Sequence, residues 1–249
     1  MEFVLICSLK HKNMGNIKNS IVTISVLFLF ILSMLVIGCS HKKSSDIDPH
    51  IPFYQDYKVI YRKHKNLTIA KATFREKNAD GIRLELLAPA KVLCNSQGSS
   101  FSNVGNYFYH WQFSGNTDVD FQLTDNRPYI FHNRILFSEI NDIEIPESFN
   151  TVDLNGTTVL HWVGTPLKKD EFVMVMILQG DKSSGDYFTD TIGSTSIALT
   201  KDLMLDLISG NAEIEVWRET NLGDVTQPDE DAGGRRIICV EIKKNIVLD

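Results

Sequence analysis

The stretch that most constrains this chain is an apolar run near its N-terminus that ends on a cysteine. No charged residue occurs from Ile21 to Ile37, three lysines precede this run, and the polar sequence SHKKSSD begins directly after Cys39. A positive flank, an apolar core and a small residue at the end form the order of a secretory signal. The 17 residues are also close to the shortest helix that crosses a ~30 Å hydrocarbon layer. The sequence therefore predicts export, with an uncleaved membrane anchor as the alternative.

The end of the run resembles the lipobox of bacterial lipoproteins, in which small or aliphatic residues and a Gly or Ala precede the lipid-bearing cysteine. Here these residues are Val36, Ile37, Gly38 and Cys39, with Val where that family more often has Leu. The resemblance implies that residues 1–38 are removed as a signal peptide and that the Cys39 sulfur carries diacylglycerol. It also implies that the new amino group is acylated, for example with palmitate. Several acyl chains anchor a protein stably, because each buried methylene adds ~0.8 kcal/mol of membrane affinity.

Two nearby residues extend this expectation. Ser40 follows the cysteine, where inner-membrane members of the lipoprotein family tend to have Asp. The resemblance therefore implies sorting to the outer membrane, if the cell has two membranes. Met14 opens a shorter positive flank, MGNIKNS, so we expect translation to start there. The choice of start leaves the mature chain unchanged.

The mature chain is acidic and has few cysteines. Removal of residues 1–38 leaves 22 Lys and Arg against 30 Asp and Glu, a formal charge of −8. Binding of nucleic acid needs a basic face that neutralises phosphates, so we exclude that class of partner. Cys94 and Cys239 fall in different predicted modules, and we expect two buried thiols rather than a disulfide. No CxxC or HExxH pattern occurs, so we expect no zinc site and no cofactor.

The remaining chain is predicted to be all-β, in two modules that follow a flexible tether. The tether, residues 39–50, is polar and has too few apolar side chains to build a core. Alternating apolar and polar side chains, the period of a half-buried strand, recur over residues 51–145 and again over 146–249. In the first module we predict strands at residues 58–63, 67–76, 82–86, 90–94, 107–113, 119–123 and 129–137.

The second module is expected to begin at Pro146, because a proline cannot continue a strand ladder. Asn155-Gly156 predicts a tight hairpin between residues 151–154 and 157–163. The sequence LTKDLMLDLISG predicts a helical turn that Thr200 caps and Gly210 ends. We predict further strands at 172–178, 195–199, 211–218 and 236–242, with Ala212, Ile214 and Val216 facing inward and Leu203, Leu207 and Ile208 as the apolar residues of the turn.

The second module resembles the immunoglobulin or fibronectin type III class. The resemblance is carried by Leu160 and Trp162 on an early strand, by the leucine turn, and by Gly233-Gly234 at the start of the last strand. The two modules have 95 and 104 residues, the size of such a sandwich. The expected fold is therefore two tandem antiparallel β-sandwiches, of which the second is the more immunoglobulin-like.

Four aromatic residues are the first candidates for a binding site. Tyr107, Tyr109 and Trp111 share one strand face and could form a platform for sugar rings. Aromatic residues at this spacing more often form the core of a sandwich, and we favour the core. Trp217 faces away from the apolar residues of its own strand. We interpret it as a cover for the junction between the modules, with an exposed interface as the alternative.

An acidic loop, residues 221–234, is the second candidate. Its carboxylates could hold Ca²⁺, but their spacing fits no EF-hand, and we predict a solvated acidic hairpin. No GxSxG motif, Cys-His signature or Gly-rich phosphate loop occurs, and the histidines are scattered, so we assign no catalytic residue. The charged residues of this region are Asp224, Asp229, Glu230, Asp231, Arg235 and Arg236.

Together these features predict a bacterial cell-envelope lipoprotein that acts as a non-enzymatic binding or structural interaction module. The chain resembles surface lipoproteins of the Gram-negative type with tandem sandwiches, which implies an envelope protein or a glycan as partner. The alternative is a carbohydrate-binding accessory protein of a glycan-uptake system, which needs exposed aromatic rings. A hydrolase, the third hypothesis, needs converging carboxylates or a Ser-His pair in a pocket.

Overall fold

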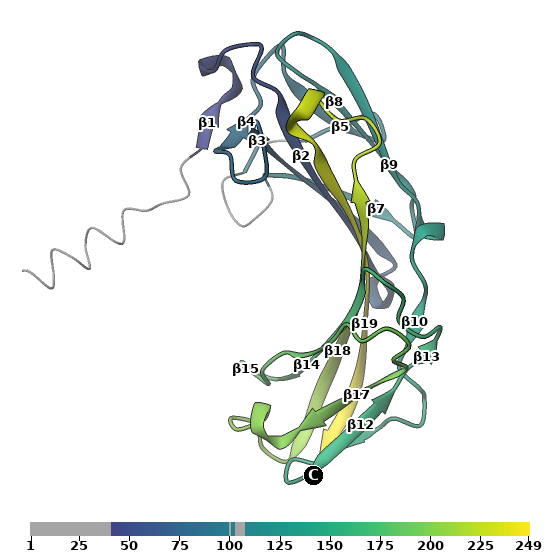
Figure 1. Cartoon of the computed structure of the whole chain (residues 1–249). Coiled ribbons are helices and arrows are strands. Elements are labelled where there is room, and N and C mark those ends of the chain that lie inside the picture. The colour runs from purple at the N-terminus through teal and green to yellow at the C-terminus, as the bar shows by residue number, and fades with distance from the viewer. Residues whose placement is uncertain (1–40, 100, 103–107) are drawn as a thin grey trace, which may run out of the picture. The chain divides into compact units, whose positions relative to one another are not determined.

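The computed structural model describes residues 41–99, 101–102 and 108–249 (Figure 1). These residues are all β: strands joined by loops and by short 3-10 turns. None of the helices among them is long and apolar enough to cross a bilayer. The predicted signal peptide, the predicted lipid site Cys39 and Tyr107 lie outside the described residues.

One long sheet runs through the described chain. Its strand order is β1-β4-β3-β2-β19-β18-β14-β15, with β7 beside β3, β11 beside β19 and β16 beside β14. The strands are β1 (His41–Lys43), β2 (Phe53–Arg62), β3 (Leu67–Glu76), β4 (Arg83–Glu85), β7 (Tyr109–Ser114), β11 (Thr151–Val152), β14 (Glu171–Gln179), β15 (Lys182–Ser183), β16 (Tyr187–Thr189), β18 (Gly210–Asp224) and β19 (Gly234–Leu248).

Three smaller sheets form the second layer, and five 3-10 turns connect elements of the described residues. The sheet β6-β5-β8-β9 contains Gln97–Gly98, Lys91–Cys94, Val119–Thr124 and Ile130–Ile135. The other two pair β12 (Thr157–His161) with β17 (Ser196–Thr200), and β10 (Ile143–Glu144) with β13 (Val163–Gly164). The turns are η1 (Ser44–Asp46), η2 (Lys63–Lys65), η3 (Phe137–Glu139), η4 (Lys201–Leu203) and η5 (Glu230–Ala232).

Two hydrophobic cores lie between the layers. The first contains buried residues of β2, β3 and β7 on one side and of β5 and β8 on the other. Its centre is aromatic: the Tyr57 ring stacks on Phe121 with 4.3 Å between ring centroids. The second core lies between β14, β18 and β19 on one side and β12 and β17 on the other. Both cores therefore share the long sheet as one wall.

The last strand contributes to both cores from the same face. Successive side chains of a strand point to opposite faces. On β19, Ile238 belongs to the first core, whereas Val240, Ile242, Ile246 and Leu248 belong to the second. All of these are even-numbered residues, so both cores lie on one face of the long sheet. The odd-numbered residues of β19 face the other way.

The predicted boundary between residues 145 and 146 does not separate two bodies. Strand β19 pairs in parallel with β2, from Gly234 opposite Gln55 to Glu241 opposite Arg62, and pairs antiparallel with β18. Strands β18 and β19 have 15 residues each, or roughly 50 Å, which is long enough to pass both cores. Residues 41–249 accordingly form one compact unit. The predicted arrangement of separate tandem modules is not confirmed, because local periodicity carries no information about this long-range pairing.

Most of the predicted tether is also ordered. Strand β1 pairs in parallel with β4, with His41 opposite Arg83. Ser44 is fully buried, and its hydroxyl oxygen both donates to the Leu87 carbonyl and accepts from the Leu87 N–H. Ile47 joins the first core. Hydrogen bonds of Ser44, in addition to burial of Ile47, hold this segment in place. The amino-acid composition of the segment does not reveal such hydrogen bonds.

Two local predictions in the second half also failed. The segments on either side of Asn155-Gly156 do not pair with each other: β11 pairs with β19, and β12 pairs with β17. The leucine turn contains only the 3-10 turn η4, and Thr200 makes no side-chain cap. The other predicted strands of both halves correspond to β2, β3, β4, β5, β7, β8, β9, β14, β17, β18 and β19, so the all-β class is confirmed.

Candidate functional site

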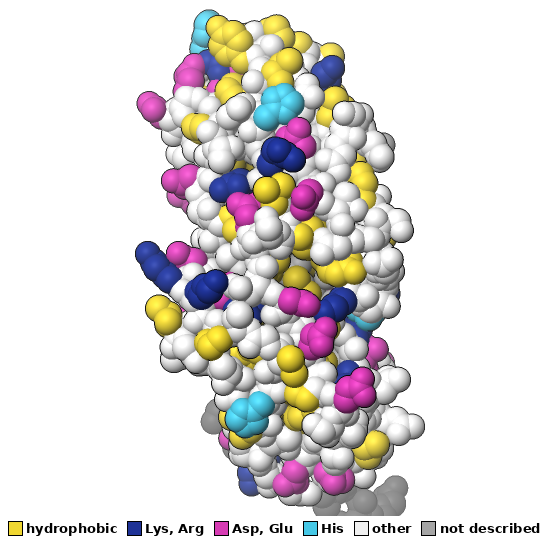
Figure 2. Space-filling model, turned by 90° about the vertical axis from the view of Figure 1, so that its right-hand side faces the viewer, with side chains coloured by type: hydrophobic (Ala, Val, Ile, Leu, Met, Phe, Trp, Pro, Cys, Tyr) yellow, Lys and Arg dark blue, Asp and Glu magenta, His cyan; other side chains and the backbone are white. Residues whose placement is uncertain are grey.

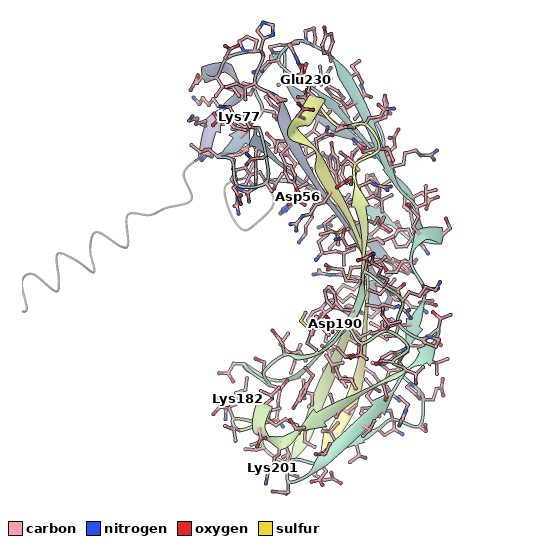
Figure 3. The ribbon with its side chains drawn as sticks, in the orientation of Figure 1. Asp56, Lys77, Lys182, Asp190, Lys201 and Glu230 are labelled. Atoms are coloured by element: carbon pink, nitrogen blue, oxygen red, sulfur yellow. The ribbon has the colours of Figure 1, made fainter. Side chains whose placement is uncertain are left out.

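The candidate site is the face of the long sheet that points away from both cores, here called the open face. It is formed by the odd-numbered residues of β18 and β19 and by their neighbours across the sheet. Of the hydrophobic clusters among the described residues, only the smallest lies on this face, with Ile60, Ile69 and Cys239 buried at its centre. Asp56, seen on this face in Figure 3, makes a two-pronged ion pair with Arg235 at 2.9 and 3.0 Å.

An apolar row crosses one end of the open face. Met174 of β14 lies opposite Trp217 of β18 on one side and opposite Phe188 of β16 on the other. The rings of Phe172 and Phe188 are 5.1 Å apart, and Phe188 is 55% exposed. Because the face of β14 toward the core carries Val173, Val175 and Ile177, this strand is apolar on both sides. The apolar row consists of Phe172, Met174, Met176, Leu178, Phe188 and Trp217.

Trp217 connects the apolar row to the strands of the first half. It is half-buried and packs against the small cluster of Ile60, Ile69 and Cys239, which lies where β18 and β19 meet β2 and β3. Trp217 therefore lies where strands of the two predicted modules meet, as expected for a residue that covers their junction. Trp217 is only half-buried, so it belongs to the open face as well.

Charged side chains form a paired network in the middle of the open face. Lys58 binds Glu219 at 2.6 Å, and Arg62 Nε binds Glu241 at 3.0 Å. Lys243 binds Glu213 at 2.6 Å and lies 3.5 Å from Glu215. Arg62 and Lys243 each link adjacent strands, whereas Lys58 reaches from β2 across β19 to β18, so the network ties three strands of the sheet together.

Two carboxyl groups meet inside this network. Glu215 and Glu241 are both buried, and they lie side by side on β18 and β19. Burial raises the pKa of Glu215, and the charge of Glu241 raises it further, against the opposing effect of Lys243. Burial also lowers the pKa of His64, whose ring lies 3.9 Å from Glu241.

A pocket of about 410 Å³ opens where one edge of β19 has no neighbouring strand. Strand β2 stops pairing at Glu241, and β11 begins pairing at Val247. Lysines are typical of strand edges that must not pair with other chains. Here the Lys244 ammonium donates to the carbonyls of Pro146 and Glu147 at 2.8 and 2.7 Å. The pocket is lined by Lys63, His64, Glu144, Ile145, Glu147, Ile242, Lys243 and Lys244.

The predicted aromatic platform does not form. Tyr109 and Trp111 are 3% and 4% exposed and belong to the first core. The Tyr109 hydroxyl accepts a hydrogen bond from the Leu86 N–H at 2.7 Å, and the Trp111 indole donates to the Gln97 carbonyl at 3.0 Å. The core interpretation that we favoured is confirmed for both residues.

The acidic loop is not a solvated hairpin throughout. Asp229 is fully buried, and its carboxylate accepts a hydrogen bond from the Phe53 N–H at 2.8 Å. Arg127 pairs with Asp229 and Glu230 and binds Asp125 at 2.7 Å. Burial raises the pKa of Asp229, against the opposing effect of the Phe53 N–H and Arg127. Sequence reasoning missed Arg127, which lies in a turn about 100 residues upstream of its partners.

A buried polar cluster holds the same loop onto β2 and β9. Gln55 and Asn133 are fully buried, and the Asn133 amide donates to Gln55 Oε1 at 2.9 Å. The Asn133 side-chain oxygen accepts from the N–H groups of Thr226 and Gln227 at 2.8 and 3.0 Å. The loop therefore serves as a structural closure of the first core. In the described residues, no three His, Cys, Asp or Glu side chains are arranged to hold a metal.

The second missed feature is an ion pair at the edge of the second core. Arg218 and Glu171 have 0% and 3% exposed side chains, and their charged groups are 2.6 Å apart. The guanidinium also donates to the carbonyls of Thr165 and Pro166 at 2.8 and 3.2 Å. Burial acts to raise the pKa of Glu171, but Arg218, the Lys168 N–H and Asn141 outweigh it, so the pKa is lowered.

The remaining cysteines behave as predicted. Cys94 and Cys239 are both free and buried, in different clusters. Burial raises the pKa of both thiols. Neither thiol is therefore suited to act as a nucleophile at neutral pH.

Among the described residues, the side with the smaller sheets offers no comparable apolar row. Figure 2 views the side on which β9, β10 and β13 lie in Figure 1, and shows apolar, acidic and basic groups interspersed. Exposed apolar residues such as Val159 and Val163 occur singly on β12 and β13. Scattered apolar residues of this kind are ordinary on protein surfaces.

Comparison with known proteins assigns no family. A scan against protein-family models finds no match, and a search of curated proteins finds none. Among solved structures, the chain is similar to one described as "Structures of Clostridium thermocellum CbhA fibronectin(III)-like modules", at 10% identity and a TM-score of 0.22. The match covers 76% of this chain and 89% of that chain. We base no assignment on a similarity of this degree. What the residues themselves define is an all-β protein with two cores on one shared sheet.

Proposed function

We propose that this chain is a lipid-anchored cell-envelope protein of fibronectin III-like type that binds a partner non-enzymatically through its open face. The apolar row is the observation that supports this proposal most directly. Four of its six apolar side chains lie along β14, Trp217 and Phe188 lie opposite Met174 on the two neighbouring strands, and Phe188 is 55% exposed. Surfaces rich in Met and aromatic residues adapt to partners and bury much area per residue.

The neighbouring network of paired charges suits the rim of such a surface. Because Lys58, Arg62 and Lys243 are already bound to carboxylates on other strands of the sheet, they need no partner to satisfy them. An interface of this kind has an apolar centre and a polar border, as in stable protein complexes. We therefore favour a protein partner. A glycan would have to rely on Trp217, since Tyr109 and Trp111 are buried.

Site-specific photo-cross-linking in intact cells tests the binding surface. A photoreactive residue at Phe188 is expected to give a discrete adduct. The same residue at Val159, which is 44% exposed in the other layer, is the matched control and is expected to give none. Adducts at both positions, or at Val159 alone, would contradict the proposal. A glycan-array hit that Trp217→Ala abolishes would instead assign the face to carbohydrate.

Metabolic labelling tests the anchor. An alkyne analogue of palmitate is expected to label the wild-type chain, whereas Cys39→Ser is expected to remain unlabelled and to keep its apolar run. Cys94→Ser is the control and should label normally, because its thiol is buried in the first core. Labelling that persists in Cys39→Ser would refute lipid attachment at this residue.

A further inference from the structure

A second exposed apolar surface lies at the leucine turn, which is outside the strands that form the open face. Leu203, Leu205 and Ile208 are 39%, 83% and 65% exposed, whereas Met204 and Leu207 are 3% and 6% exposed and belong to the second core. Two side chains therefore anchor the turn, and three of the same apolar kind point to solvent. We call the three exposed residues the distal patch.

Hydrogen bonds hold the turn in one conformation. The Gly185 N–H donates to the Leu203 carbonyl at 2.8 Å, and the Leu207 N–H donates to the Met204 carbonyl at 3.0 Å. The Gln179 amide group donates to the Ile208 carbonyl at 2.8 Å and accepts from the Ile208 N–H at 3.0 Å. The distal patch is thus presented on a fixed backbone, so a partner that covers it has little ordering to impose.

Charges around the distal patch are mainly negative. Asp202 and Asp206 flank Leu205 in the turn, and both are exposed. The adjoining loops add Asp181 and Asp186, against Lys182 and Lys201, which Figure 3 shows on this part of the molecule. None of the ion pairs found among the described residues involves these carboxylates. Acidic groups of this kind oppose contact with an anionic lipid surface and attract basic groups.

We propose that the distal patch docks a partner protein segment whose apolar side chains are flanked by Lys or Arg. The apolar side chains would cover Leu203, Leu205 and Ile208, and the basic groups would meet Asp202 and Asp206. This surface is independent of the open face, so either assignment can fail without the other. Large exposed apolar side chains on a rigid turn, rimmed by uncompensated charge, are features of interaction sites.

Selection of short random peptides displayed on phage, against the full chain, tests the proposal. Enriched peptides are expected to combine Lys or Arg with apolar residues. Their affinity should fall about tenfold or more for Leu205→Ser/Ile208→Ser, and should stay unchanged for the matched control Val159→Ser/Val163→Ser. Asp202→Asn/Asp206→Asn should weaken binding and reduce its dependence on salt. Thermal unfolding of each variant serves as a check of folding, because all of the changed side chains are exposed.

Three results would overturn the proposal. The first is that no enriched peptide depends on Leu205, or that those that do are acidic. The second is self-association of the wild type in sedimentation velocity that Leu205→Ser abolishes, which would make a second copy the occupant. The third is co-sedimentation with phosphatidylglycerol vesicles that requires Leu205, which would assign the distal patch to a membrane.

Discussion

Replacing Arg218 with Met is expected to destabilise the chain strongly. The side chain of Arg218 is fully buried, and Glu171, its partner at 2.6 Å, is 3% exposed. Met keeps most of the apolar stem but leaves a carboxylate buried without its cation. It also removes the donors to the carbonyls of Thr165 and Pro166. Breaking a buried pair from one side costs ~3–5 kcal/mol.

The size of the effect can be followed by thermal unfolding. In a chain of about this length, each kcal/mol lowers Tm by ~2–4 °C, so Arg218→Met should lower Tm by roughly 6–20 °C. Far-UV circular dichroism follows the thermal unfolding, and a urea titration measures the loss of unfolding free energy independently. The unfolding slope in urea should not change, because the same surface becomes exposed.

Two controls separate the lost charge pair from a general effect of arginine removal. Arg235→Met breaks the ion pair with Asp56, whose side chain is 9% exposed, but the Arg235 side chain is 48% exposed and water reaches the pair, so the loss of stability should be clearly smaller than for Arg218→Met. Arg218→Met/Glu171→Leu should be less destabilised than Arg218→Met alone, because no buried charge is left unpaired. Equal losses of unfolding free energy in Arg218→Met and Arg235→Met would refute the reasoning.

Three further outcomes follow from the same structure. Because the pKa of Glu171 is lowered, the stabilisation from its ion pair is present above the ordinary carboxyl pKa and is lost as pH falls; urea midpoints of wild type and Arg218→Met should converge in acid. The pKa of Glu215 is raised, so its ionised form destabilises the fold. Glu215→Gln should therefore raise Tm near pH 8 and leave Tm nearly unchanged near pH 4. A lower Tm of this variant at pH 8 would contradict the prediction. A Cβ at Gly234 would overlap the Gln55 carbonyl oxygen, so Gly234→Ala should lower Tm measurably in a thermal melt, whereas Gly98→Ala, where nothing is close, should not.

The sequence predicted the parts of the fold that depend on alternation. Ala212, Ile214 and Val216 were expected on the core side of their strand, and all three lie in the second core. The same rule contains a signal for the buried ion pair. Arg218 continues the inward series of its strand, and Glu171 continues that of Val173 and Val175. A charged residue on a core face requires a partner of opposite charge, so the pair was open to prediction.

Other features depend on contacts between distant parts of the chain and have no local signature. The pairing of β2 with β19 joins residues about 180 apart, and nothing in either strand specifies the other. Arg127 and Asp229 are 102 residues apart in the sequence. Their residue types suit a surface turn and an acidic hairpin equally well, so only the assembled fold reveals that they are buried together. The open face could be predicted only in part: Trp217 was expected to point away from the core, but residues 172–178 are apolar on both faces, a pattern typical of a strand that is covered on both sides.

The shared strand also limits the order in which the chain can acquire its structure. The first core includes Ile238, and its wall is completed by the pairing of β19 with β2. The ribosome must therefore synthesise nearly the whole chain before the N-terminal half can close, whereas domains with local contacts can fold as they emerge. Loss of the last few dozen residues should leave both halves unfolded, not one.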